Sequence, residues 1–496
     1  MIGGYMTEQY RGIDPALYHG LDPEVAEVLA TWAEVHRRHY TLDRWLVNGR
    51  SRQPVAVVCE TDSHAARTMM LILKVLSPQN DSLDANEFFR HRQAESDRSD
   101  FAAAHLSTFV HDAVFVPSGR RWITFQEIAA KGLENTEVLT VLLRRMLNLA
   151  DPAELPIGRE IDCTHEVFTA ACRIIVAGVL GDWARSPFIP EKVTWDLPTF
   201  FERHLFDQLE PNGRLEAWAR ANQADMIRCD GESSPLPNPF AVAQGRLLAD
   251  VTITPLLGRS HGDLHTDNAL IRVRPRVDVT DYYLIDTALY EAVGPITRDP
   301  AHLVLYIIAR SMEAIAPVQQ SALIELLLDP IDGPAYAVPT WLGELIRGID
   351  AETRAWSERG SLGQRWSEQN YLSLAACAML FLGRTSTREA DKPWFLRLAA
   401  RAVAKFAEQR RVPLDGSSTA QATAIRSQAV PQPNSPGPSV PTPAVAPTEP
   451  PVPADAPPEG EDGRGSRKKK GATYDVRVKG SKGVQIGDHG HQVNKW

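Results

Sequence analysis

The fold is decided by Ser260-His261-Gly262-Asp263-Leu264-His265-Thr266-Asp267-Asn268-Ala269-Leu270-Ile271, followed by Tyr282-Tyr283-Leu284-Ile285-Asp286. This stretch places an Asn five positions after Asp263 and a second Asp at the end of an apolar strand. Asp263 is a candidate catalytic base, placed to accept or orient the proton of an attacking hydroxyl. Asn268 and Asp286 offer the oxygen ligands that Mg²⁺ prefers. The stretch therefore contains the groups that phosphoryl transfer requires.

The histidines of this stretch allow two interpretations. In the first, His261 ties the loop together by hydrogen bonds, His265 is a loop residue, and Asp267 could still touch the metal. In the second, the alternation of His261, Asp263, His265 and Asp267 forms a zinc or iron cluster, because imidazole and carboxylate suit both metals. The second interpretation leaves Asn268 and Asp286 without a role.

Lys74 supports phosphoryl transfer from a distant part of the sequence. It lies in the otherwise apolar strand expected at 70–75, where a cation could pair with the α- and β-phosphates of ATP. A lysine can also end a buried strand by extending its ammonium to water. On the next helix, Glu87 or Glu95 would be its ion-pair partner. We favour Glu87, which lies on the nearer turns.

The order of expected elements predicts an α+β fold with two lobes. Within the region that begins at 42, strands are expected at 45–47, 55–58 and 70–75, followed by a helix at 83–98 and two further strands at 107–116 and 122–128. From 135 onward the apolar residues follow a helical period. The expected helices are 138–149, 164–183, 301–313, 321–328, 371–382 and 393–409.

Two loops of the first lobe would contact the nucleotide. The connector after the fifth strand contains Glu127 and Ile128, whose backbone groups could meet adenine. The loop expected to cover the phosphates, Asn48-Gly49-Arg50-Ser51-Arg52-Gln53-Pro54, has a single glycine. Its backbone amides therefore approach phosphates less freely than those of a Gly-rich loop. Gly49 and Ser51 are nonetheless its candidate binding residues, and a plain exposed hairpin tip is the alternative.

With these residues the chain resembles the aminoglycoside phosphotransferase and choline kinase branch of the protein-kinase-like superfamily. In that branch His-Gly-Asp and a following Asn form the catalytic loop, and the metal aspartate follows Ile, as in Ile285-Asp286. More narrowly, the residues 298–303 and the helical insertion at 186–250 resemble the kinase-like ternary-complex-associated domains of bacterial conflict systems. The resemblance implies an ATP- and Mg²⁺-dependent bilobal fold. Thr287 and Ala288 replace the Phe-Gly of protein kinases, which argues against activation-loop control.

The expected domain organisation has five parts. Composition changes near Asp415, and the stretch from Pro431 to Gly460 is rich in proline and cannot form a packed core. The parts are an N-terminal helical extension (1–41), the first lobe (42–130), the second lobe (131–412), a disordered linker (413–472) and a short interaction motif (473–496).

Bulk composition limits the partners and the location. The net charge of -9 gives no global basis for binding nucleic acid or an anionic membrane. Five cysteines without a CxxC pair indicate reduced thiols. We found no signal peptide and no apolar run of about 20 residues, the length needed to cross a bilayer. We therefore expect a cytoplasmic protein.

The C-terminal segment alternates β-branched and polar residues around glycines. Such a segment is too short to bury a core, but copies from many chains can stack as cross-β. It resembles the RIP homotypic interaction motif and its bacterial amyloid-signalling relatives. Gly490 stands where those motifs usually have Asn. A disordered tail is the alternative. The residues that would carry homotypic or heterotypic assembly are Val484, Gln485, Ile486, Gly487, Gln492 and Asn494.

Two hypotheses follow from the sequence. The first is an ATP-dependent phosphotransferase that acts on a protein or a small molecule. The second is a pseudokinase-like adaptor that binds a nucleotide or a partner and signals through its C-terminal motif. The full set of Lys74, Asp263, Asn268 and Asp286 favours the first, whereas the glycine-poor loop and the tail favour the second.

Overall fold

The computed structural model describes residues 12–46, 54–65, 67–77, 86–149, 161, 163–185, 193–414 and the backbone of 423–424. They belong to one unit of the chain, Met1–Val430. Gly49 and Ser51 of the expected phosphate loop lie outside the described residues, as does the expected interaction motif at 484–494. These assignments therefore stay predictions.

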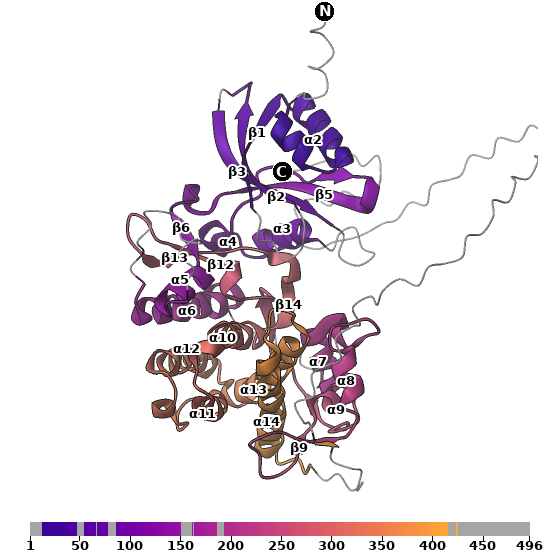
Figure 1. Ribbon diagram of the computed structural model, residues 1–496, viewed down its shortest axis with the longest axis vertical. Helices are drawn as coiled ribbons and strands as arrows, with labels where there is room; N and C mark the ends of the chain where they lie inside the picture. The colour runs from indigo at the N-terminus through magenta and orange to yellow at the C-terminus, as the bar shows by residue number, and fades with distance from the viewer. Residues whose placement is uncertain are drawn as a thin grey trace, which may run out of the picture. The chain divides into compact units, whose positions relative to one another are not determined.

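A five-stranded antiparallel sheet forms the first lobe, in the order β1-β2-β3-β5-β4 (Figure 1). Two helices separate β3 from the β4–β5 hairpin, in agreement with the expected succession of strands and helix. The first strand begins at Arg38 and ends at Trp45, earlier than the strand expected at 45–47. The strands are β1 Arg38–Trp45, β2 Val55–Asp62, β3 Arg67–Leu76, β4 Val114–Val116 and β5 Arg121–Glu127.

The pleat of β3 decides where Lys74 points. Successive side chains of a strand point to opposite faces. Leu71, Leu73 and Val75 are buried on one face, in a core shared with α1 (Pro15–Gly20) and α2 (Pro23–Val35). Lys74 therefore points to the other face of the sheet. The two N-terminal helices, expected as a separate extension, instead complete the core of the first lobe.

Two helices follow β3 where one was expected. The side chain of Asn86 accepts hydrogen bonds from the backbone amides of Phe88 and Phe89, so that α3 (Glu87–Asp97) begins at Glu87. Arg98 leaves the helical conformation, and α4 (Ser99–His105) starts directly after it. The cap places Glu87 in the first turn of α3, close to the sheet.

Two small antiparallel sheets frame the candidate catalytic loop. β11 pairs with β14, and β12 lies between β13 and β6. The loop 261–268 thus connects strands of two different sheets. The strands are β6 Thr136–Val138, β11 Leu257–Ser260, β12 Ala269–Arg272, β13 Asp278–Leu284 and β14 Glu291–Pro295, and the short turns are η6 Thr266–Asn268 and η7 Thr287–Leu289.

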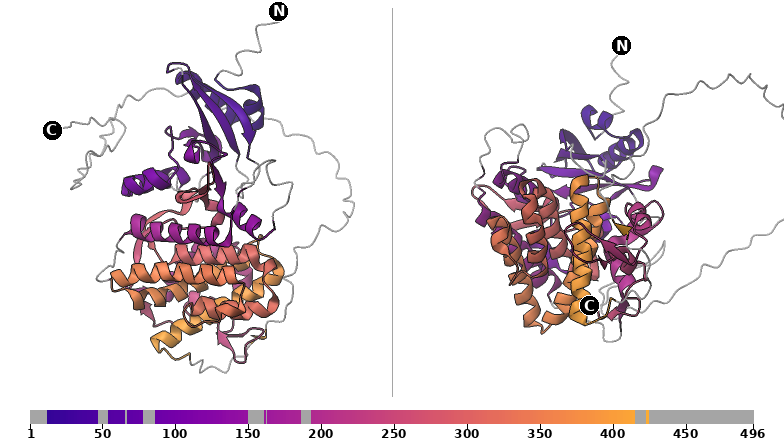
Figure 2. Two further views of the ribbon diagram at one scale, coloured as in Figure 1. Left: turned by 90° about the vertical axis from the view of Figure 1, so that its left-hand side faces the viewer. Right: turned by 60° about the horizontal axis from the view of Figure 1, so that its bottom comes forward.

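The second lobe is mostly helical, as expected, and its long helices run side by side (Figure 2). One long helix, α12, was not anticipated, although its buried residues follow a helical period. The helices are α5 Leu139–Met146, α6 His165–Gly178 with the π-helical continuation η4 Val179–Ala184, α10 Arg298–Ser311, α11 Pro317–Leu328, α12 Thr340–Arg359, α13 Gly363–Gly383 and α14 Lys392–Arg410.

The stretch His165–Ala184 is long and apolar enough to cross a membrane by length and composition. In the structure it packs inside the second lobe. Phe168, Cys172, Ile175 and Val176 are all fully buried in the core of that lobe. Burial in a protein core thus accounts for its apolar character.

The insertion contains several short elements. The described residues between 193 and 253 pack mainly through α7, whose His204 donates or accepts a hydrogen bond with Ser373 of α13 at 2.9 Å. The insertion therefore packs against the long helices of the second lobe. Its elements are β7 Trp195–Asp196, α7 Leu197–Leu205, η5 Phe206–Leu209, α8 Glu216–Ala221, β8 Met226–Arg228, β9 Leu236–Pro237, α9 Pro239–Ala243 and β10 Thr252–Ile253.

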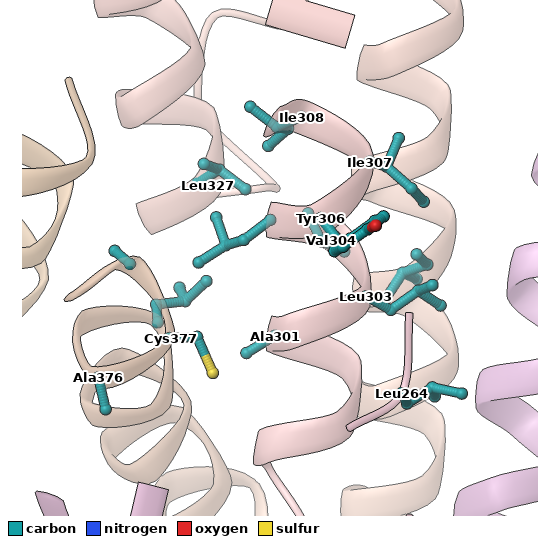
Figure 3. Packing of buried hydrophobic residues seen from close by; sticks show 14 of the residues in the cluster. Leu264, Ala301, Leu303, Val304, Tyr306, Ile307, Ile308, Leu327, Ala376 and Cys377 are labelled. Carbon is teal, nitrogen blue, oxygen red and sulfur yellow. The ribbon is translucent and has the colours of Figure 1, made fainter. Parts of the chain in front are cut away.

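The core of the second lobe holds the catalytic loop in place. Leu264, next to Asp263, is fully buried, and Figure 3 shows it beside Leu303 of α10. On the other side of α10, the same figure places Cys377 of α13 next to Ala301. None of the five cysteines, all of which lie in the described residues, forms a disulfide. The described residues therefore form an α+β fold with two lobes, as the sequence predicted.

Candidate functional site

The ion pair expected at Lys74 is formed with Glu87. Lys74 Nζ lies 2.7 Å from Glu87 Oε1, and both side chains are largely buried. Glu95 contacts His91 and Arg92 of its own helix instead. Burial disfavours the charged form of Lys74, but the charges of Glu87 and Asp286 outweigh this effect and raise the pKa of Lys74. Lys74 is therefore a permanent cation that also interacts with the second lobe.

Asp299 of α10 anchors the start of the catalytic loop. Its carboxylate accepts hydrogen bonds from the backbone amides of His261 at 2.7 Å and Gly262 at 3.0 Å. His261 Nε2 lies 3.0 Å from the carbonyl oxygen of Ile285, which links the loop to the strand that precedes Asp286. His261 thus makes the tying hydrogen bonds expected of it.

Gly262 is required by the shape of this loop. Its φ is +79°, a left-handed conformation that glycine adopts without strain. A Cβ atom at this position would lie 2.0 Å from the carbonyl oxygen of Leu289. No other residue type fits without moving the backbone.

Asp263 is surrounded by nitrogen donors. His265 Nε2 lies 3.4 Å from its Oδ2, while His302 Nδ1 and Arg384 Nη2 lie 3.5 and 3.6 Å from its Oδ1. Burial would raise the pKa of Asp263, but the hydrogen bond from His265 and the positive charge of Arg384 outweigh burial and lower that pKa well below its usual value. The side chain remains 28% exposed. Asp263 is therefore an accessible, ionised carboxylate.

Asp286 lies at the same end of the β12–β13 pair as Asn268. The backbone amide of Ile285 donates to the carbonyl of Asn268 at 3.0 Å, and Asn268 Nδ2 donates to the carbonyl of Asp263 at 3.0 Å. Asp286 has a φ of 59° and a ψ of 64°, in the left-handed region that few non-glycine residues adopt. This turn holds the Asp286 carboxylate toward Lys74 and Glu87.

The electrostatic surroundings of Asp286 suit a cation. The residue is exposed to solvent, yet desolvation of its carboxyl is the largest contribution to the shift of its pKa. Together with the negative charges of Glu87 and Asp263, it outweighs the attraction of Lys74 and raises the pKa of Asp286 to about 6. A divalent cation would remove this penalty, and the carboxylate and amide oxygens of Asp286 and Asn268 are hard ligands of the type Mg²⁺ prefers.

The zinc or iron alternative is wrong. Among the residues the structure describes, no group of three or more His, Cys, Asp and Glu side chains could hold a metal ion. Asp267, which could have touched metal, accepts hydrogen bonds from Thr140 and Tyr306 and lies 3.5 Å from Arg310. It joins the loop to α5 and α10. Mg²⁺ at Asn268 and Asp286 would therefore need phosphate oxygens or water to complete its coordination.

Two backbone groups of the connector expected to meet adenine form hydrogen bonds within the protein. The amide of Glu127 donates to the carbonyl of Thr108 at 2.8 Å, and the carbonyl of Ile128 accepts from the amide of Lys131 at 3.0 Å. Glu127 is exposed, whereas Ile128 is buried. The Glu127 amide and the Ile128 carbonyl are therefore engaged within the protein, and contact of this connector with adenine stays a prediction.

Three residues near Asp263 were missed by the sequence interpretation. Asp299 and His302 lie in α10, and a polar pair in an apolar helix is the one signal that could have identified them. Arg384 follows α13 and gives no local signal. It reaches the site only because α13 packs against α10.

Comparisons with known proteins give little further information. No family model and no curated protein matches the chain. Similar solved structures include a glucosamine kinase in complex with glucosamine, ADP and inorganic phosphate, at 11% identity, over 78% of this chain and 86% of that chain, with a TM-score of 0.37. An aminoglycoside phosphotransferase from Alicyclobacillus acidocaldarius subsp. acidocaldarius DSM 446 is 13% identical, over 75% of this chain and 92% of that chain, with a TM-score of 0.33. Because the identities and TM-scores are low, these similarities assign no role to any residue of this chain.

Proposed function

We propose that this protein is an ATP- and Mg²⁺-dependent phosphotransferase that acts on a hydroxyl acceptor. The observation that carries the proposal is the convergence of residues from both lobes. The Lys74–Glu87 pair of the first lobe interacts electrostatically with Asp286, which in turn interacts with Asp263. These are the cation, metal ligand and hydroxyl-orienting carboxylate that phosphoryl transfer needs.

Each residue has a distinct task in this mechanism. Lys74, held by Glu87, binds the α- and β-phosphates of ATP. Mg²⁺ held by Asn268 and Asp286 would offset the negative charge of the phosphoryl oxygens. Asp263 accepts a hydrogen bond from the acceptor hydroxyl and directs its oxygen toward the phosphorus. His261 and Asp299 keep the loop in the shape that presents Asp263.

The segment after Asp286 supports an enzyme without activation-loop control. Between Asp286 and the start of α10 at Arg298, the chain forms η7 and β14, and β14 pairs with β11. This leaves no long loop that a phosphate could order. Both small molecules and proteins remain possible acceptors.

A nucleotide-binding adaptor with little turnover is the second candidate, favoured by the single glycine in Asn48–Pro54. In either case we propose that Val484-Gln485-Ile486-Gly487 mediates self-assembly in a cytoplasmic bacterial signalling or conflict system. If so, the full-length chain should form thioflavin-positive assemblies, and Gly487→Pro should prevent them. Assemblies that persist unchanged in Gly487→Pro would contradict a role for this motif.

The decisive experiment measures Mg-ATP turnover by the full-length chain and by Asp263→Ala. We expect turnover above background for the native chain and loss of about 10²- to 10⁴-fold in the variant. Thermal stabilisation by Mg-ADP should be the same for both, because Asp263 is not a metal ligand in the proposal. Equal background ATP loss in both chains, with stabilisation retained, would establish the adaptor instead.

A further inference from the structure

Hydrogen bonding fixes the proton positions of the two histidines beside Asp263. Arg384 Nη2 lies 2.7 Å from His302 Nε2. A guanidinium can only donate, so His302 Nε2 must be the acceptor. In a neutral imidazole the single proton is then on Nδ1. Arg384 therefore determines which nitrogen of His302 carries the proton.

The Nδ1–H group of His302 faces Asp263. Nδ1 is buried without a hydrogen-bond partner among the described residues, and it lies 3.5 Å from Asp263 Oδ1. His302 is fully buried, and burial together with the positive charge of Arg384 lowers its pKa well below the usual value. His302 is therefore neutral, and its one ring proton lies on the nitrogen that is 3.5 Å from Asp263 Oδ1.

The same reasoning assigns the ring proton of His265, which faces Asp263 Oδ2. The backbone amide of Asp267 donates to His265 Nδ1 at 3.1 Å, so the ring proton of the neutral form is on Nε2. Nε2 lies 3.4 Å from Asp263 Oδ2. The ring is stacked on Tyr306, with centroids 4.4 Å apart and planes at 11°, which fixes its orientation. Both carboxylate oxygens of Asp263 thus face an N–H group.

Packing also fixes Arg384. Its guanidinium lies over the rings of Phe381 and Tyr306, at 4.6 and 5.6 Å from their centroids. Among the described residues, its one carboxylate within ion-pair distance is Asp263, at 3.6 Å. Its side chain is only 15% exposed. The cation is therefore preorganised by aromatic contacts, and Asp263 is the carboxylate that balances it.

We propose that His302 and Arg384 are positioning residues for Asp263. Arg384 sets the tautomer of His302, both groups hold Oδ1, and His265 holds Oδ2, so the carboxylate keeps one orientation toward the acceptor hydroxyl. An ionised carboxylate has about four lone-pair sites. Three donors leave a site for the acceptor on the exposed part of Asp263. The inference rests on the proposed function only for the role of Asp263.

This arrangement suits a reaction that needs alignment more than proton abstraction. In the loose transition state of phosphoryl transfer, the attacking hydroxyl forms little bonding to phosphorus, and catalysis depends on positioning and electrostatics. A carboxylate already surrounded by donors is a weak proton acceptor but a rigid hydrogen-bond acceptor. His302 and Arg384 therefore contribute to rate through the orientation of Asp263.

The first test measures the tautomers directly. In the full-length chain with ¹⁵N-labelled histidine, imidazole spectra between pH 6 and 8 should show neutral His302 with its proton on Nδ1, and the neutral form of His265 should carry its proton on Nε2. In Arg384→Ala, His302 should lose this single tautomer. A protonated His302 at pH 7, or a proton on Nε2 in the native chain, would overturn the inference.

The second test measures Mg-ATP hydrolysis, with water as the acceptor. Arg384→Ala and His302→Leu should lower kcat about 10²-fold and leave KM for ATP unchanged, because misalignment affects the acceptor and not the nucleotide. Free guanidinium should partly restore Arg384→Ala, and His302→Gln, which retains an N–H donor, should keep most of the activity. Arg310→Ala is the matched control, since Arg310 stacks on the same Tyr306 ring but reaches Asp267.

The outcomes separate this inference from the proposed function. Native-like kcat in Arg384→Ala and His302→Leu, alongside loss in Asp263→Ala, would refute the positioning role and leave the phosphotransferase standing. Background hydrolysis by the native chain would refute the phosphotransferase. In that case the tautomers would still decide whether His302 and Arg384 hold Asp263.

Discussion

Asp263 and Asp286 belong to the same site but lie in opposite surroundings. Asp263 faces N–H donors from His265, His302 and Arg384, and its pKa lies well below the usual value. Asp286 faces the carboxylates of Glu87 and Asp263, and its pKa rises to about 6. The protein stabilises the negative charge of Asp263. Around Asp286, the positive charge of Lys74 does not outweigh burial and the neighbouring negative charges.

This difference indicates how two chemically identical side chains acquire different tasks. A carboxylate that the protein already stabilises gains little from binding a cation, which fits the proposed role of Asp263 in orienting a hydroxyl. A carboxylate whose charge is opposed by its neighbours gains most from Mg²⁺. Environments that push two carboxylates apart in pKa are how acid, base and ligand roles are divided in enzyme sites.

The largest effect should come from removing the charge of either aspartate in turn. Asp263→Asn should lower turnover by about 10²- to 10⁴-fold and leave Mg-ATP affinity near the native value, since the hydroxyl loses its anionic acceptor. Asp286→Asn should instead weaken the Mg²⁺-dependent part of ATP affinity. Titration calorimetry with and without Mg²⁺ measures the binding. If the two variants lose affinity equally, the division of roles is wrong.

The next effect concerns the cation between the lobes. Lys74→Met leaves Glu87 and Asp286 without their shared positive partner, and breaking a largely buried ion pair costs about 3 kcal/mol of unfolding free energy. Chemical denaturation of the full-length chain measures this. The double variant Lys74→Met/Glu87→Gln is the control and should recover part of the loss. If the double variant is no more stable than Lys74→Met, the Lys74 and Glu87 side chains are not energetically coupled.

A smaller effect is expected at the bend that presents Asp263. Gly262→Ala adds a Cβ that meets the carbonyl oxygen of Leu289 and requires a left-handed alanine, at a cost of about 1–3 kcal/mol. Turnover should fall because Asp263 shifts, while Mg-ADP stabilisation through Asp286 should persist. Gly181→Ala is the matched control, because nothing lies within 4 Å of its added Cβ. Equal stability of both variants would contradict the strain argument.

The smallest effect is a pH dependence specific to Asp286. Folding raises its pKa from 3.8 to about 6, so its contribution favours the folded state at low pH and is lost as the pH rises through 6. Protons and Mg²⁺ compete for this carboxylate, and Mg²⁺ affinity should be about tenfold weaker at pH 5 than at pH 7. The increase in melting temperature caused by Mg-ADP, compared at pH 5 and pH 7, measures this change in Mg²⁺ affinity. Asp286→Asn should abolish this pH dependence, and a dependence that survives the substitution would assign it to another group.

Local patterns predicted the elements that carry short-range signals. The apolar strand around Lys74, the helix after it and the His-Gly-Asp loop each have a pattern within a few residues, and all three lie near their expected places. The ends were less accurate. β1 begins at Arg38, and α3 begins at Glu87 because Asn86 caps it. A cap depends on a single side-chain hydrogen bond, which periodicity does not detect.

The sequence by itself determined the fold class and the residue types of the site: Lys74, Asp263, Asn268 and Asp286. Only the tertiary structure decided how each of them behaves. The choice of Glu87 over Glu95, the anchoring by Asp299 and the contact of Arg384 with Asp263 join residues far apart in the chain. The physical reason is that charge and hydrogen bonding act over a few ångströms in space, and only the packing of α3, α10 and α13 brings these groups within that range.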